Sequence, residues 1–116
     1  MDYDHREIEG KWRECWERQD LYATGKPGKR RVYCLDMFPY PSGTVLHVGH
    51  TLGFVASDIY ARFKRMQGYS VLHPMGWDAF GLPIEQSAIQ KGEHPRAVVD
   101  RNCAEFKNAM RMLDLS

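Results

Sequence analysis

The sequence predicts an α/β fold in which a parallel βαβ unit carries flanking helices. A short apolar run of β-prone residues at 32–35 is followed by a loop and then by a long amphipathic stretch from about His47. Gly68 offers a helix stop before a second β-prone run at 69–73. Because a crossover of this length joins parallel strands, we expect both runs in one sheet, with the helix packed against it.

The first helix is predicted near the N-terminus. Asp4 and Glu7 have the spacing of a capping box, and Ile8, Trp12 and Trp16 follow at helical spacing, so we expect the tryptophans in the core. A turn at 26–29 should end this segment before the first strand, which we expect within 31–37.

The remaining helices are read from the same signals. In the central helix, the apolar residues at positions 52, 55, 59, 63 and 66 share one face, which we expect to be buried. A short helix is expected over 84–91, closed by Gly92. Pro95 should open a last helix with an apolar stripe, formed by Val99, Cys103, Phe106, Met110 and Leu113.

Composition excludes several classes of protein. Sixteen Lys and Arg against fifteen Asp and Glu give a formal charge of +1, so no global field attracts nucleic acid. No apolar run approaches the roughly 20 residues of a membrane span, and the acidic start is unlike a signal peptide. We therefore expect a cytoplasmic protein with no membrane partner.

The segment at 38–50, FPYPSGTVLHVGH, is the strongest candidate site. A loop that joins a strand to a helix presents backbone N–H groups and the positive end of the helix dipole, which favour anions. The loop carries neither a Walker lysine nor a G-x-G-x-x-G pattern. His47 and His50 share one helix face, and Gly49 between them allows close approach. The pair predicts two donors beside one phosphate.

Two motifs in this sequence resemble a known family. His47, Gly49 and His50 match the H-x-G-H signature of the class I aminoacyl-tRNA synthetases, and GWDAFGLP at 76–83 is similar to the amino-acid pocket of the leucine, isoleucine and valine group. Together with 37–43 and 72–75, they resemble the leucyl-tRNA synthetase branch.

This resemblance implies a fold and a domain division. Residues 29–116 should form the first half of a Rossmann-like catalytic domain, and residues 1–28 an N-terminal helix and linker. A complete synthetase is far longer than 116 residues. The resemblance therefore implies an N-terminal fragment, truncated before the editing insertion and without the second signature loop.

The resemblance also implies a reaction and its residues. The family activates its amino acid with ATP and transfers it to tRNA, which here gives leucine, leucyl-adenylate and tRNA(Leu), with Mg²⁺ accompanying ATP. His47 and His50 would be the catalytic donors to ATP phosphates, and Met37, Phe38 and Gly49 would complete the ATP site. The leucine site would comprise Phe38, Tyr40, Asp78 and Phe80, with Asp78 pairing the ammonium group. No residue is assigned to a metal.

Other interpretations stay open at this point. Ile84 and Glu85 after Gly-Leu-Pro also fit an isoleucyl- or valyl-type synthetase, and H-x-G-H occurs in small nucleotidyltransferases. The two histidines could instead simply cap the helix. The isolated chain could bind ATP weakly without turnover, and we expect it to self-associate through an unpaired strand edge and an apolar helix face.

Overall fold

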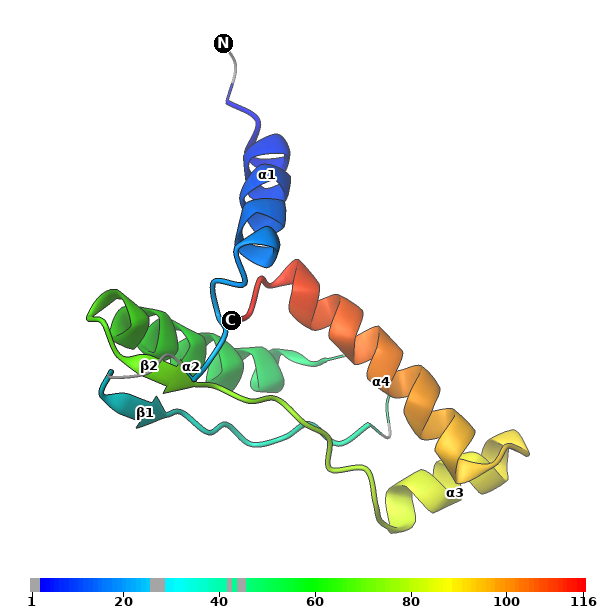
Figure 1. Ribbon diagram of the computed structural model, residues 1–116. Coiled ribbons are helices and arrows are strands. Elements are labelled where there is room, and N and C mark those ends of the chain that lie inside the picture. Colours follow the sequence, from blue (N-terminus) through cyan, green and yellow to red (C-terminus); the bar gives the residue numbers. More distant parts are fainter. Residues whose placement is uncertain (1–2, 26–28, 42, 44–45) are drawn as a thin grey trace.

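The computed structural model describes residues 3–25, 29–41, 43 and 46–116 (Figure 1). Its elements follow in the order α1 (His5–Arg18), β1 (Arg31–Tyr33), α2 (Val48–Met66), β2 (Ser70–Leu72), α3 (Leu82–Lys91) and α4 (Pro95–Met112). The predicted order of helices and strands is confirmed. Among the described residues, no helix combines the length and the apolar character needed to cross a bilayer.

The two strands form the predicted parallel pair. Val32 lies opposite Val71 in the register, and α2 is the crossover between the strands. Both strands are shorter than the sequence indicated, because the pairing ends soon after Tyr33. Cys34 still donates its N–H to Leu72 O at 2.9 Å. The chain then runs into a loop containing Pro39 and Pro41, which have no N–H to continue a ladder.

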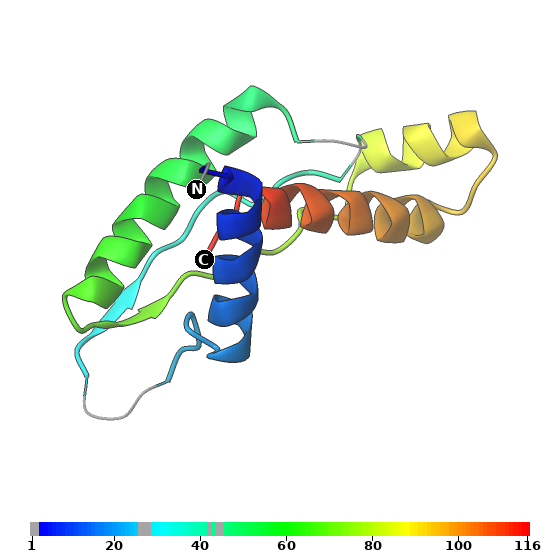
Figure 2. The ribbon, with the colours of Figure 1, turned by 90° about the horizontal axis from the view of Figure 1, so that it is seen from above.

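The chain does not close around a single core. Its radius of gyration is 17.0 Å, whereas a compact domain of about 100 residues has roughly 13 Å. Figures 1 and 2 show α2 with the sheet in one part, α3 with α4 in another, and α1 projecting from both. The buried apolar residues accordingly come from both parts: Phe54 and Ala61 of α2 with Val71 of β2, and Ile84, Ala88, Val98 and Phe106 of α3 and α4.

The predicted buried face of α2 is wrong. The buried residues are Phe54, Asp58 and Ala61, which lie on nearly the opposite side of the helix from the predicted stripe. That stripe is exposed, with 76% of Leu52 and 63% of Ile59 open to solvent. The sheet takes the face that carries a small alanine and a paired aspartate, because these allow the helix to approach it closely.

The N-terminal helix is capped as predicted but packs differently. Asp4 accepts N–H groups from Arg6 at 2.9 Å and Glu7 at 3.4 Å. None of the residues of α1 is buried, and Trp12 is exposed, so its assignment to the core is wrong. Figure 1 shows α1 projecting from the other elements, and its contacts are few: Arg13 pairs with Asp114, and the Arg62 guanidinium lies 5.3 Å from the centre of the Trp16 ring.

The last helix begins at Pro95 as predicted, and its apolar stripe is partly confirmed. Cys103 and Phe106 are buried, but Leu113 is exposed. Val98 and Asn102 complete the buried face instead. The packing is displaced toward the N-terminal half of α4, because α3 contacts this half.

Candidate functional site

The two motif loops meet beyond the carboxyl ends of β1 and β2. Asp78 donates its backbone N–H to Pro39 O at 3.1 Å, and the Tyr40 hydroxyl donates to Phe80 O at 3.3 Å. These contacts join the segment after β1 to the segment after β2, at the edge where parallel α/β sheets commonly bind ligands. The two motif loops are therefore in direct contact at this edge.

Two glycines allow this close approach. A Cβ built on Gly76 would lie 2.8 Å from the ring of Phe38, and one on Gly81 would lie 2.7 Å from the Tyr40 hydroxyl. Gly81 also has φ +136°, a conformation that other residues rarely adopt. The aromatic side chains of the first loop thus lie directly on the backbone of the second.

The two histidines cap the start of α2. Nδ1 of His47, the N-cap residue, accepts the N–H of Gly49 at 3.1 Å, and Nδ1 of His50 accepts the N–H of His47 at 3.4 Å. Their rings stack with centroids 3.7 Å apart. A Cβ on Gly49 would lie 2.9 Å from the ring of His47, so the glycine leaves room for the stack. The two histidines therefore cap the helix, as one of the alternative interpretations of the sequence predicted.

The cap also determines which ring nitrogen is free to donate. Because Nδ1 of each ring accepts a hydrogen bond, the N–H that can donate elsewhere is at Nε2. Burial, and in second place the neighbouring His47, lower the pKa of His50, which keeps it neutral at pH 7. Each ring therefore retains one N–H donor, at Nε2, that the cap does not use.

Aromatic side chains support these rings from behind. The ring of His50 lies 5.9 Å from that of Phe54 and 6.4 Å from that of Phe106. Phe106, in α4, also stacks on Trp77 at 6.0 Å. Trp77 lies inside the second motif, but its contact with a helix that begins eighteen residues later could not be predicted from the motif itself.

The remaining predicted site residues line an open surface. Met37 is 85% exposed and Phe80 is 91% exposed, and Asp78 is exposed as well. Phe80 borders a hollow of about 390 Å³ together with Ile84 of α3 and other residues of α4. The structure thus groups Phe38, Tyr40 and the backbone of Asp78, and leaves Met37 and the Phe80 ring in solvent.

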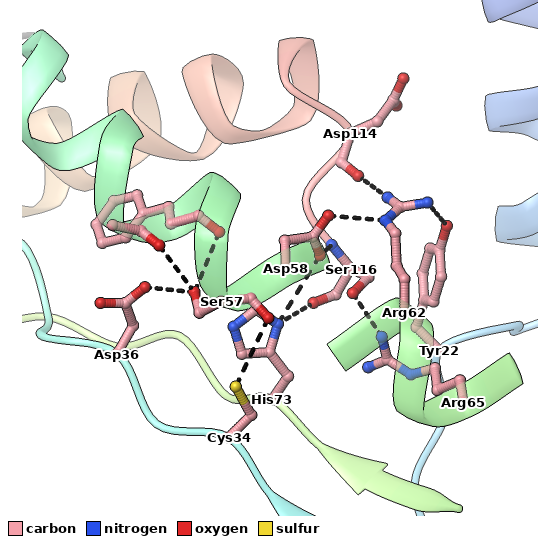
Figure 3. A network of polar contacts seen from close by, with 12 residues as sticks. Tyr22, Cys34, Asp36, Ser57, Asp58, Arg62, Arg65, His73, Asp114 and Ser116 are labelled. Carbon is pink, nitrogen blue, oxygen red and sulfur yellow. Dashed lines mark hydrogen bonds and ion pairs between the residues drawn. The ribbon is translucent and has the colours of Figure 1, made fainter. Parts of the chain in front are cut away.

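A polar network joins the C-terminal half of α2 to the segments that follow α1 and α4 (Figure 3). Asp58 of α2 is buried and accepts hydrogen bonds from Arg62 Nε at 2.7 Å and from the backbone N–H of Ser116 at 2.6 Å. Arg62 also donates to the Tyr22 hydroxyl at 2.7 Å and to Asp114 O. The guanidinium thereby joins α2 to the segments after α1 and α4.

The same network reaches the second motif loop through His73. Its Nδ1 lies 2.8 Å from Ser116 O, and its side chain is only 5% exposed. His73 follows β2 directly and precedes the loop, so this contact fixes the point where the loop begins. His73 thus packs against the end of the chain at the point where β2 stops.

Comparisons with known proteins agree with the motifs. The family model described as tRNA synthetases class I (M) matches residues 33–116. The leucine–tRNA ligase of Chloroherpeton thalassium is 56% identical over 117 residues, covering 100% of this chain and 14% of that protein. The ligase of Mycoplasmopsis pulmonis is 54% identical over 114 residues, covering 98% and 14%. The chain thus spans about one seventh of the length of these relatives.

Two solved structures of aminoacyl-tRNA synthetases also superpose on this chain. A LeuRS of Agrobacterium radiobacter K84, in a ternary complex with tRNA and LeuAMS, superposes with a TM-score of 0.88 at 40% identity, over 98% of this chain and 15% of that one. Mycobacterium tuberculosis methionyl-tRNA synthetase, in complex with methionyl-adenylate, superposes at 0.72 and 33% identity, over 75% and 17%.

Proposed function

The chain belongs to the class I tRNA synthetases, and on this basis we propose that its residues bind ATP and leucine in a leucine–tRNA ligase. The reaction forms leucyl-adenylate and then leucyl-tRNA(Leu) in the cytoplasm. The observation that carries the proposal is the pair of stacked imidazoles at the start of α2, beside two motif loops in contact.

In adenylate formation, the leucine carboxylate attacks the α-phosphorus of ATP. A bond forms between carboxylate oxygen and phosphorus, the bond from phosphorus to the bridging oxygen breaks, and pyrophosphate leaves. Negative charge spreads over the phosphate oxygens, so fixed donors accelerate the step without a nucleophilic side chain. The Nε2–H groups of His47 and His50 are these donors, and they need no reorientation because the cap already holds the rings.

The other site residues bind and orient the substrates. Gly49 leaves space for the nucleotide against the start of the helix, and Met37 and Phe38 border it. Asp78 pairs with the leucine ammonium group, while Phe38 and Tyr40 contact the isobutyl group and the exposed Phe80 ring borders it. Such pockets separate substrates that differ by one methylene by only about 1–3 kcal/mol.

Mg²⁺ would enter with the phosphates of ATP, whose charge it neutralises. Among the described residues, no three His, Cys, Asp or Glu side chains are grouped to hold a metal ion. We therefore assign no residue of this chain to Mg²⁺. The catalytic region comprises residues 29–116, and residues 1–28 form a separate helix and linker, a division supported by the absence of buried residues from α1.

The test is pyrophosphate exchange with leucine, isoleucine, valine and methionine. It is run on this chain and on a hybrid ligase, in which the chain replaces the matching 117 residues of the Chloroherpeton thalassium enzyme. We expect leucine to be the fastest substrate of the hybrid, and the isolated chain to bind ATP weakly with little turnover. A hybrid inactive with all four amino acids, beside an active parent ligase, contradicts the proposal.

A second candidate is activation of a different amino acid by the same site. The similarity to a methionyl-tRNA synthetase, at a TM-score of 0.72, favours including it. Faster exchange with methionine, isoleucine or valine than with leucine would establish this candidate instead.

The role of the histidines is tested with variants that keep the cap. His47→Asn retains a good N-cap residue but removes the Nε2 donor, so the helix should stay intact. Losing one such donor typically slows the reaction about 10²–10³-fold. Wild-type exchange rates in the His47→Asn hybrid would exclude this histidine from catalysis.

The isolated chain self-associates through the exposed apolar face of α2. Val48, Leu52, Val55 and Ile59 line one shallow apolar hollow on this face. Apolar patches of this kind promote association. Sedimentation should show dimers or larger species at micromolar concentration, and Leu52→Glu should reduce them. A compact wild-type monomer would contradict this expectation.

A further inference from the structure

A buried asparagine in α4 contacts the first motif loop. Asn102 is 0% exposed, and its Nδ2 donates to Pro41 O at 2.7 Å, across 61 positions of sequence. Its Oδ1 has no hydrogen-bond partner among the described residues. Burying an amide is unfavourable unless it is hydrogen-bonded, so an apolar side chain would pack here at lower cost. The contact with the loop is what the amide contributes.

This contact completes a two-sided hold on the loop. Pro39 and Pro41 are fully buried, and the carbonyl of each accepts a hydrogen bond from a different part of the chain. Pro39 O accepts from Asp78 of the second motif loop, and Pro41 O accepts from Asn102 of α4. Tyr40, a candidate leucine-binding residue, lies between the two anchored prolines.

One helical turn further along α4, Phe106 reaches both remaining parts of the site. It is 1% exposed, and its ring lies 6.4 Å from the ring of His50 and 6.0 Å from that of Trp77. Residues four apart share a helix face, so Asn102 and Phe106 present one surface to the loop, the histidine and the second motif.

We propose that Asn102 and Phe106 are positioning residues, through which α4 sets the loop at 38–41 relative to His50. Neither residue lies in a motif, and neither needs to contact a substrate. They fix the distance and orientation between the leucine-binding loop and the histidine that contacts phosphate. The proposal rests on the proposed function, since adenylate formation is where that relation has an effect.

The first test compares Asn102→Leu with Asn108→Leu in the hybrid ligase. Asn108 is exposed on the same helix, so the matched substitution there leaves the loop untouched. We expect Asn102→Leu to lower kcat for pyrophosphate exchange about 10–100-fold, with KM for ATP and leucine within about threefold of wild type, because small misplacements act on the transition state. Asn102→Ser keeps a hydroxyl donor and should recover part of kcat. Equal kcat values for Asn102→Leu and Asn108→Leu overturn the proposal.

The second test uses NMR of the chain itself and requires no activity. If Nδ2 of Asn102 donates to Pro41 O, one of its amide protons exchanges with solvent more slowly than either proton of Asn108. Phe106→Leu should shift the imidazole resonances of His50, whereas Asn108→Leu should not. Fast exchange of both Asn102 protons overturns the proposal.

The two tests separate the two hypotheses. An inactive wild-type hybrid, with the Asn102 amide protected, counts against the proposed function alone. An active hybrid that tolerates Asn102→Leu counts against the positioning role alone.

Discussion

Replacing Gly49 by alanine should change the orientation of the His47 ring while leaving the stability of the first turn of α2 nearly unchanged. An added Cβ would lie 2.9 Å from Cε1 and 3.0 Å from Nδ1 of the His47 ring, closer than such atoms can pack. The ring belongs to an exposed side chain, so it moves while the helix backbone stays in place. The substitution therefore displaces the imidazole.

The effect on stability is the sum of two opposing terms. Alanine stabilises a helix interior by about 0.5–1 kcal/mol relative to glycine. Displacing the ring removes the 3.1 Å bond from the Gly49 N–H to His47 Nδ1, and losing a cap of this kind costs about 1 kcal/mol. Because the terms nearly cancel, Tm should change by less than about 4 °C. Adenylate formation should fall about 10²-fold, since one donor is no longer in place.

Gly53→Ala is the matched control on the same helix. A Cβ there would meet Asp36 Oδ1 at 3.5 Å, an ordinary contact, so only the helix-propensity term remains. Thermal melting of the chain should show a Tm about 4 °C higher for Gly53→Ala, with exchange in the hybrid ligase unchanged. If Gly49→Ala raises Tm equally and keeps the wild-type exchange rate, the reasoning about the His47 ring is refuted.

Three further predictions concern the pocket, the pH dependence and the polar network. Gly76→Ala places a Cβ 2.8 Å from the Phe38 ring, so KM for leucine in the hybrid should rise about tenfold, and KM for ATP should rise as well because Phe38 borders both substrates. Burial and His47 lower the pKa of His50 below its ordinary 6.5, so the unfolded chain binds this proton more readily than the folded chain. Stability measured by urea unfolding should be fully present above pH 6.5, should fall as the pH drops below it, and should fall less in His50→Gln. Arg62→Met leaves the buried carboxylate of Asp58 without its ion-pair partner, so the free energy of unfolding should drop by about 3 kcal/mol in urea.

Each of these predictions has its own control or contradicting outcome. Gly10→Ala meets nothing within 4 Å and should leave both KM values unchanged. An identical pH slope in His50→Gln and wild type would rule out His50 as the source of the pH dependence. Arg96→Met removes an ion pair with the same i,i+4 spacing whose side chains are 84% and 70% exposed, and it should be nearly neutral. If Arg62→Met and Arg96→Met lower the free energy of unfolding by similar amounts, burial of the Asp58–Arg62 pair is not the cause of the loss.

Features of the fold that depend on residues close together in the chain could be predicted from the sequence. Asp4, His47 and Gly92 mark helix ends through their own side chain or backbone, and all three lie at the predicted boundaries. The parallel pairing of the two strands followed from the length of the crossover between them, which is also read from a continuous stretch of sequence.

The buried face of α2 could not be predicted from neighbouring residues. Periodicity identifies an apolar face but not the surface that covers it, and Asp58 has the character of a solvent-exposed residue. It is buried because Arg62 and the N–H of Ser116 pair with it, and Ser116 is 58 positions away. Asn102 is a similar case, because its partner, Pro41 O, belongs to a distant loop. A polar residue within an apolar helical stripe was the only available signal.

The network in Figure 3 also determines when this structure can form during synthesis. Asp58 and Arg62 of α2 are joined to Ser116 and Asp114 across 58 and 52 positions. A ribosome adding about 5–20 residues per second needs roughly 3–10 s to reach Asp114 after Arg62. Through that interval, the carboxylate of Asp58 has Arg62 beside it but lacks the Ser116 N–H, so the network of Figure 3 is complete only after the residues that follow α4 have been added.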